Sequence, residues 1–268
     1  MSRAGVVWTG DVRLGFERRG ERTVAREQYC HGALKVMRGL RHPGSRAPHW
    51  TLMNPGGGYV DGDRYSIALR LGAGCDAVVD SQCATKVYRC EGDDARQTMR
   101  VSLGEDAVLG LRPHPLIAYR DARYVQDTVV EMDPSAVFSC REIVTSGWSA
   151  DGREFAFDSV RMRLRVDFVG GLTGQTGTTA LTGRTALVDN LVLEPGAVDP
   201  RSPVALGGFS HVGTVAVVAE GLPSGEEVRD VCRAAGGVAA GVGGGRCRIG
   251  VGGVPGVSMV VRCLGGET

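Results

Sequence analysis

The segment 160–168, VRMRLRVDF, decides the fold class, because its side chains alternate strictly between apolar and charged. Successive side chains of a β-strand point to opposite faces, so this period of two predicts a strand with one buried and one charged face. The apolar positions are Val160, Met162, Leu164, Val166 and Phe168, and the charged positions are Arg161, Arg163, Arg165 and Asp167.

Strand signals of the same kind recur along the chain. Ile67, Leu69 and Leu71 alternate with Ala68 and Arg70. Further short apolar runs lie at 77–79, 101–103, 128–130 and 185–188, and turn residues separate them at 56–58, 72–74, 151–152 and 170–171. The 41 glycines fit many turns between short strands. The spacing predicts a mainly β protein whose sheets are joined by turns rather than by helices.

One helix is predicted near the C-terminus. Ser224 can cap it and Glu227 can complete a capping box. An apolar stripe follows at Val228, Val231, Cys232 and Ala235, and glycines 236–237 end it. Strands are expected on both sides, at 214–219, 238–242 and 257–263. The sequence therefore predicts a β-rich part over 1–200 and a small β-α-β-β element over 201–268, packed as a single unit.

Composition favours a protein of the cytoplasm that binds neither nucleic acid nor membrane. With 31 basic and 30 acidic side chains the net charge is +1, which gives no whole-molecule attraction to polyanions. The N-terminus has no apolar signal core, and no apolar stretch is long enough to span a bilayer. The eight cysteines show no CxxC pairing, so free thiols are expected rather than a zinc site.

Sequence motifs typical of enzymes are either absent or lack the neighbouring structure that their chemistry requires. The segment 72–77, GAGCDA, fits a dinucleotide fingerprint, but strand-like sequence follows where a helix is required. No phosphate-binding P-loop occurs. The segment 208–213, GFSHVG, misses the nucleophile elbow by one residue. We therefore predict a protein without catalytic activity, with a thiol or serine hydrolase as one alternative.

A second alternative is a β-rich module that binds nucleic acid or another ligand. The Arg161, Arg163 and Arg165 face can bind phosphates, although a solvated face or one docked on a partner's carboxylates fits the neutral chain better. The histidines at 31, 42 and 49 form no i, i+4 metal pair on a recognisable helix.

Several ordered segments resemble the urease accessory protein D family, UreD, also called UreH. The segment 53–65, MNPGGGYVDGDRY, resembles the family's glycine-rich GGxVxGDR string, and 81–89, SQCATKVYR, resembles its ATKVYR string. The segments 111–119, LRPHPLIAY, and 140–147, CREIVTSG, follow in the family's order, as do 191–195 and 213–215. The resemblance covers about 28–264.

This resemblance implies a fold and a role. The fold would be a two-layer helical stack of short β-strands with a small C-terminal α/β element. The role would be that of a non-catalytic scaffold that bridges apo-urease and a UreF-type protein, with a UreG-type GTPase bound through UreF. No cofactor would be tightly bound, and Ni²⁺ would be in transit to the urease active site.

Candidate site residues follow from that role. A hydrated metal ion that must be released needs weak oxygen ligands rather than a cage of thiolates or imidazoles. We predict the carboxylates Asp63, Asp61 and Glu142 for the metal path, with neutral oxygens from Ser81 and Thr85. Lys86, Tyr88 and Arg89 combine long reach with amphipathic contact area and are predicted to bind a partner. Each has a structural alternative, such as a turn, a surface ion pair or a place in the strand ladder.

Overall fold

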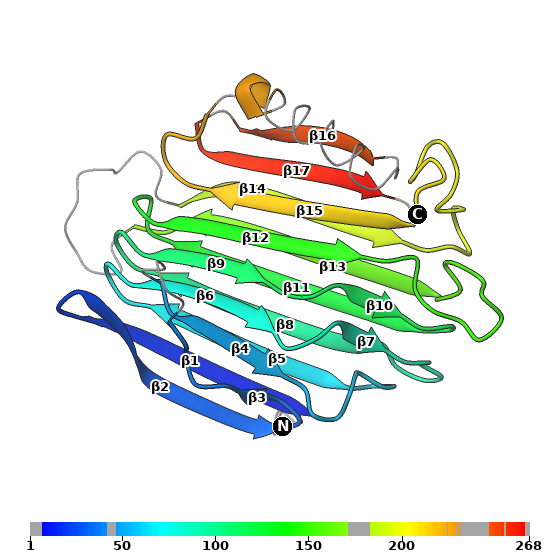
Figure 1. Cartoon of the computed structure of the whole chain (residues 1–268), viewed down its shortest axis with the longest axis horizontal. Coiled ribbons are helices and arrows are strands. Elements are labelled where there is room, and N and C mark those ends of the chain that lie inside the picture. Colours follow the sequence, from blue (N-terminus) through cyan, green and yellow to red (C-terminus); the bar gives the residue numbers. More distant parts are fainter. Residues whose placement is uncertain are drawn as a thin grey trace, which may run out of the picture.

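A computed structural model describes residues 7–41, 47–170, 183–223, 225–228, 230, 247–254 and 256–265. The prediction of a mainly β protein is confirmed. The strands form a sheet of seven and a sheet of ten, and the two lie one behind the other as layers in Figure 1.

The seven-stranded sheet has the order β14-β13-β11-β8-β5-β1-β2. It includes the segment that decided the fold class, because that segment forms β13. Its strands are β1 (Gly10–Arg19), β2 (Arg22–Gly32), β5 (Arg64–Leu71), β8 (Ala95–Leu103), β11 (Arg123–Met132), β13 (Ser159–Phe168) and β14 (Arg184–Leu193).

The second sheet has the order β16-β17-β15-β12-β9-β6-β4-β3, with β10 and β7 paired beside it. Its strands are β3 (Lys35–Val36), β4 (His49–Met53), β6 (Asp76–Ser81), β7 (Thr85–Val87), β9 (Val108–Arg112), β10 (Leu116–Ala118), β12 (Val137–Val144), β15 (His211–Val218), β16 (Cys247–Val254) and β17 (Ser258–Gly265).

From β4 to β13 the chain crosses repeatedly between the two sheets. It runs from β4 to β5, back to β6, on to β8, and so on to β13, so each return brings a new strand beside the previous strand of the same sheet. Neighbours such as β5 and β8, or β11 and β13, are therefore parallel although no helix connects them. The predicted turn at 72–74 lies between β5 and β6 in this path.

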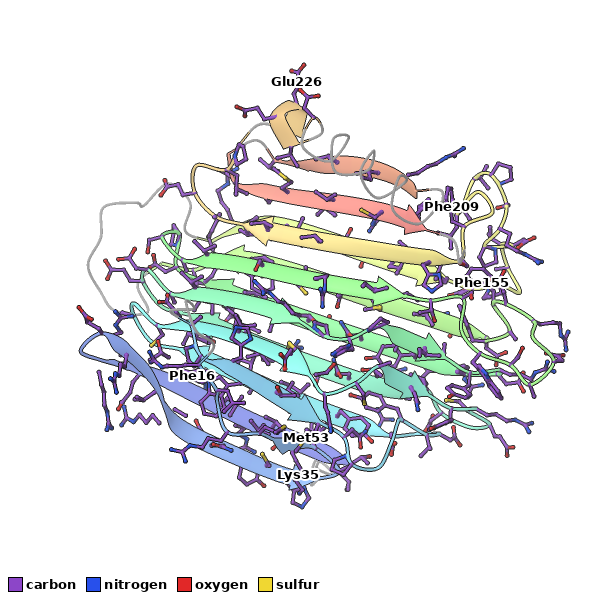
Figure 2. The ribbon with its side chains drawn as sticks, viewed as in Figure 1. Phe16, Lys35, Met53, Phe155, Phe209 and Glu226 are labelled. Atoms are coloured by element: carbon purple, nitrogen blue, oxygen red, sulfur yellow. The ribbon has the colours of Figure 1, made fainter. Side chains whose placement is uncertain are left out.

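The core lies between the sheets and is built from the inward phase of each strand. At one level the register aligns Leu14, Leu69, Val101, Val130 and Val166 across five strands. All five are at most 2% exposed. Burial of such rows is the main favourable term in folding. Figure 2 shows side chains along the full length of both layers, with Phe16 at one end and Phe209 at the other.

The C-terminal β-α-β-β element stays a prediction, because only part of it, without Ser224, lies within the described residues. Residues 225–228 and 230 are helical, and Figure 2 shows Glu226 projecting from them. The stripe positions 231, 232 and 235, the glycines 236–237 and the predicted strand at 238–242 lie outside the described residues. β15 pairs with β12 and with β17, so hydrogen bonding continues across residue 200. The division at residue 200 stays a prediction.

Candidate functional site

A cavity of about 110 Å³ lies between the two sheets. The seven-stranded sheet contributes Gln97, Tyr124, Gln126 and Thr128, and the second sheet contributes Cys140 and Glu142. The loop residues at 82–84 and 113–114 also line it. A water molecule needs at least roughly 10–15 Å³ of such space, so the cavity has room for several.

Polar side chains reach this interior because one row of the seven-stranded sheet breaks the apolar rule. The register aligns Tyr65, Gln97 and Gln126 as Cα neighbours on the inward phase. Opposite them, Cys140 and Glu142 stand two residues apart on β12, both on its inward phase. The interior therefore has a polar wall beside its apolar core.

A chain of hydrogen bonds starts at Glu142. Gln126 Nε2 donates to Glu142 Oε1, and Gln126 Oε1 accepts from Tyr124 Oη at 3.0 Å and from Gln97 Nε2 at 3.4 Å. Tyr59 Oη then donates to Gln97 Oε1 at 2.6 Å. Partners of this kind let buried polar groups lie inside the core without a large desolvation cost.

The chain of contacts continues from Tyr59 to Asp63. The ring of Tyr59 stacks on that of Tyr65 with centroids 3.9 Å apart. Tyr65 Oη donates to Asp63 Oδ2 at 3.0 Å, and Asp63 also accepts from Thr9 Oγ1 at 3.0 Å and from Val60 N at 2.9 Å. All of these donors are satisfied by one carboxylate, so Asp63 ties the glycine-rich segment to β5 and to the residue before β1.

Glu142 is the titratable group that stands out in the cavity. Burial raises its pKa to about 7, and the charge of Asp189 adds to the rise, while the hydrogen bond from Gln126 opposes it. Burial also raises the pKa of Cys140, Tyr59, Tyr65 and Tyr124, so these groups stay protonated at neutral pH. Near neutral pH the carboxyl of Glu142 is therefore poised to exchange a proton.

The other predicted metal-path residues lie at different places. Ser81 and Thr85 line the cavity. Ser81 Oγ accepts from His114 N at 2.9 Å and donates to Cys83 O at 3.0 Å. Asp61 is exposed, and its carboxylate accepts from the backbone N–H groups of Gly92 and Asp93. The structure thus brings Glu142, Ser81 and Thr85 to one cavity, and places Asp61 and Asp63 in the adjoining loop.

The predicted partner-binding residues lie on and after β7, beside the cavity. Lys86 lines the cavity. Arg89 is 66% exposed and forms loose ion pairs with Glu91 at 3.5 Å and Asp121 at 3.7 Å. Tyr88 begins an aromatic ridge that continues through Tyr119 to Trp148, with centroid separations of 4.8 and 5.1 Å. Trp148 is 53% exposed, which leaves the end of this ridge open to solvent.

Gly58, the third glycine of the run 56–58, lies where the glycine-rich segment packs closely against β7. The segment runs beside β7 in a parallel bridge between Tyr59 and Val87, since Tyr59 N donates to Lys86 O and Tyr88 N donates to Tyr59 O, both at 2.8 Å. A Cβ on Gly58 would lie 2.6 Å from the ring of Tyr88 and 2.8 Å from Lys86 O. A methyl group therefore fits only if the two segments separate.

We expect Gly58→Ala to lower the free energy of unfolding by ~1–3 kcal/mol, the usual range for overpacking. Gly196→Ala is the control, because nothing lies within 4 Å of the position of its Cβ. That change should shift stability by less than ~0.5 kcal/mol. Urea denaturation of both variants measures the difference. Equal midpoints for the two would contradict the close approach at Gly58.

Sequence reasoning missed most of the polar wall. Gln97, Gln126, Tyr124 and Tyr59 carry the hydrogen bonds, and none of them was a candidate. A signal existed for β11, where Tyr124, Gln126 and Thr128 occupy the phase that should be apolar. Polar residues on the inward phase of a strand indicate a buried network or a cavity.

The two enzyme-like segments, 72–77 and 208–213, are not followed by the helices that their motifs require. Residues 72–75 join β5 to β6, residues 76 and 77 already belong to β6, and β15 begins at His211, directly after Ser210. Ser210 Oγ and His211 Nδ1 are 2.8 Å apart, but in the described part of the chain no carboxylate is hydrogen-bonded to His211. Among the same residues no cluster of three or more His, Cys, Asp or Glu is arranged to hold a metal. No described helix is long and apolar enough to cross a membrane.

Two packed sheets with a polar cavity between them place the chain in the class of two-layer β proteins. Comparison with known proteins gives the particular family. Residues 9–268 match the family model described as UreD urease accessory protein. The chain belongs to the UreD family, and a role in urease maturation follows from that membership.

Relatives from several bacteria agree with this assignment, and each carries the description "Urease accessory protein UreD". The protein of Actinomyces naeslundii is 37% identical over 97% of this chain and 88% of its own length. That of Arthrobacter sp. (strain FB24) is 38% identical over 78% of this chain and 68% of its own length. That of Corynebacterium glutamicum (strain ATCC 13032) is 35% identical over 80% and 72%.

Proposed function

We propose that this chain is a non-catalytic scaffold of the cytoplasm that holds apo-urease and a UreF-type protein together while Ni²⁺ passes to the urease active site. A UreG-type GTPase joins the assembly through UreF. The observation that carries the proposal is the carboxyl group of Glu142 in the polar wall of the inter-sheet cavity. Its raised pKa and its place beside neutral oxygens suit a metal ion in passage.

The nickel path runs along weak ligands. Ni²⁺ entering the cavity meets neutral oxygens of Ser81 and Thr85, then the amide oxygens of Gln97 and Gln126, and then Glu142. Oxygen donors bind Ni²⁺ more weakly than thiolates or imidazoles, so the ion is not trapped. When Ni²⁺ reaches Glu142 it displaces the proton of that carboxyl, and the carboxylate then offsets part of the charge of the buried ion. Asp61 and Asp63 remain candidates for the approach to this path.

The partner surface in this proposal is the aromatic ridge of Tyr88, Tyr119 and Trp148, flanked by Arg89. Aromatic and arginine side chains supply most of the binding energy at protein interfaces. The ridge adjoins the cavity through Lys86, which is two residues from Tyr88 and lines the cavity. We assign the ridge to the UreF-type protein, because a partner bound there would lie beside the cavity that Ni²⁺ crosses.

Truncating the end of the ridge should weaken this contact. We expect Trp148→Ala to raise the dissociation constant for the UreF-type protein at least tenfold, the loss of about 1.4 kcal/mol or more that a hot-spot aromatic gives. Val204→Ala removes a side chain that is 90% exposed elsewhere on the surface and should leave the constant unchanged. Calorimetric titration measures both. Equal affinities for the two variants would remove the ridge from the interface.

Reconstitution tests the function as a whole. Apo-urease, UreF-type and UreG-type proteins, GTP and limiting Ni²⁺ are incubated with and without this chain, and the nickel bound per urease active site is measured. The scaffold should raise nickel incorporation without being consumed and without turnover of its own. Incorporation that is the same in its absence would overturn the proposal.

A further inference from the structure

The outer face of the seven-stranded sheet carries arginines in rows. In one row the register aligns Arg165 with Val129, Val129 with Arg100, Arg100 with Ala68, and Ala68 with Arg13. The row ends at Val188 on β14 and at Tyr29 on β2. Guanidinium groups and small apolar side chains thus alternate across the whole width of the sheet.

A second row lies four residues earlier in both β8 and β13. It aligns Val192 with Arg161, Arg161 with Val125, Val125 with Arg96, and Arg96 with Arg64. Arg163 lies between the two rows on β13, and Arg70 lies beyond the first row on β5. We call this surface the arginine face; its cations are Arg13, Arg64, Arg70, Arg96, Arg100, Arg161, Arg163 and Arg165.

The cations of the arginine face fall into a paired and an unpaired group. Arg13, Arg96, Arg100, Arg161 and Arg165 form ion pairs with carboxylates of this chain. Over the described ranges Arg64, Arg70 and Arg163 form none. Three guanidinium groups, each with five N–H donors, are therefore left for an external acceptor.

The face is large enough for a stable protein interface. Seven strands at about 4.8 Å spacing span roughly 29 Å, and a ten-residue strand at about 3.3 Å per residue is roughly 33 Å long. The product is roughly 950 Å², somewhat above the 800 Å² or so that each partner contributes to an interface of standard size.

The pattern of charges selects among possible partners. A second copy of the chain would bring the same unpaired arginines to the contact and would be repelled. A nucleic acid would meet the carboxylates that already pair with five of the arginines, and its phosphates would be repelled by them. A protein surface with spaced carboxylates satisfies Arg64, Arg70 and Arg163 and also packs against the valines that alternate with arginines within the rows.

We propose that the arginine face is a docking surface for an acidic protein face, and that this face belongs to apo-urease. The identity of the partner rests on the proposed function, in which the aromatic ridge is occupied by the UreF-type protein and apo-urease needs a separate contact. Unpaired surface charges mainly steer association and set partner choice, so the contact is sensitive to salt.

The test measures affinity for purified apo-urease and for the UreF-type protein separately. The double variant Arg70→Glu, Arg163→Glu should weaken binding to apo-urease at least tenfold at about 0.1 M salt and leave UreF binding unchanged. Arg141→Glu is the matched control, because Arg141 is an exposed arginine of β12 in the other sheet. It should bind apo-urease like the unaltered chain. The double variant Arg70→Gln, Arg163→Gln should give an intermediate loss, and thermal melting checks that all variants fold.

Each outcome decides the inference. If the double reversal binds apo-urease as well as the unaltered chain does, or if Arg141→Glu weakens binding equally, the arginine face is not the docking surface while the scaffold function still stands. If the unaltered chain binds neither apo-urease nor the UreF-type protein, the proposed function fails as well. Tighter binding of duplex DNA than of apo-urease, lost in the double reversal, would also overturn the inference.

Discussion

Glu142→Gln is expected to lower the nickel incorporated into urease at limiting Ni²⁺ at least tenfold. Glutamine has nearly the same shape and can still hydrogen-bond with Gln126, but it cannot become an anion. In the low-dielectric interior a single charge is the strongest attraction that the cavity offers to a divalent cation. Nickel per urease active site, measured by atomic absorption after reconstitution, gives the result.

The pH dependence of nickel transfer should identify the same carboxyl group. Burial raises the pKa of Glu142 to about 7, so the group is mostly protonated at pH 6 and mostly ionised at pH 8. Transfer through the unaltered chain should therefore rise with pH, with a midpoint near 7. The Glu142→Gln variant should lack that rise. A profile with the same midpoint in both proteins would assign the titration to another component of the assembly.

The same substitution should stabilise the protein at alkaline pH. The pKa of Glu142 in the folded state lies above its ordinary value of 4.5, so the folded protein favours the protonated form. The stability that this group contributes is complete below pH 4.5 and is lost as pH rises through 7. The loss is at most about 3.5 kcal/mol, because each pKa unit corresponds to about 1.4 kcal/mol. Glu142→Gln should therefore nearly match the unaltered chain at pH 5 and exceed it at pH 8.5 in urea denaturation.

Together these outcomes separate a functional carboxyl from a structural one. A variant that transfers less nickel because it is damaged should also unfold more easily. A variant that transfers less nickel while gaining stability above pH 7 has lost a group kept for function at the expense of stability.

The strands could be predicted from the sequence because the pattern of apolar residues within each strand is local. The alternation at 160–168 identified β13 and the face on which its arginines lie, and the short runs at 77–79, 101–103, 128–130 and 185–188 all fall within strands. The pairing of strands could not be predicted in the same way. Which strand lies beside β13 depends on the path of the chain between two sheets, and no local pattern records that path.

The site could be predicted only where a single residue was enough to suggest a role. Glu142 was a candidate because it is a carboxylate in the segment 140–147, which resembles the family, and that reasoning needs no knowledge of strand register. The polar wall depends on register, since Gln97 and Gln126 become partners only when β8 and β11 align them. The arginine face has the same origin: single arginines are visible in β1, β5, β8 and β13, but their rows exist only across the sheet.

Asp63→Ala should have the largest effect on stability, a loss of ~2–4 kcal/mol, because hydrogen bonds to a charged acceptor contribute ~1.5–3 kcal/mol each and are not additive. The carboxylate accepts from Thr9 Oγ1, Val60 N and Tyr65 Oη at 2.9–3.0 Å. Tyr65 is only 1% exposed, so its hydroxyl would be left with the weaker 3.5 Å contact from Asn54 Nδ2. Urea denaturation at pH 7 measures the loss.

Asp61→Ala is the control for Asp63, because it removes a carboxylate from the same loop. Asp61 accepts from two backbone N–H groups in an exposed turn, so its loss should cost no more than ~1 kcal/mol. Nickel transfer by folded Asp63→Ala, measured below its unfolding temperature, then decides the role of this residue. Full transfer by the weakened protein would make Asp63 a structural anchor of the glycine-rich segment. Lost transfer with unchanged stability would make it a ligand of the path, and would show that its three donors do not hold the loop.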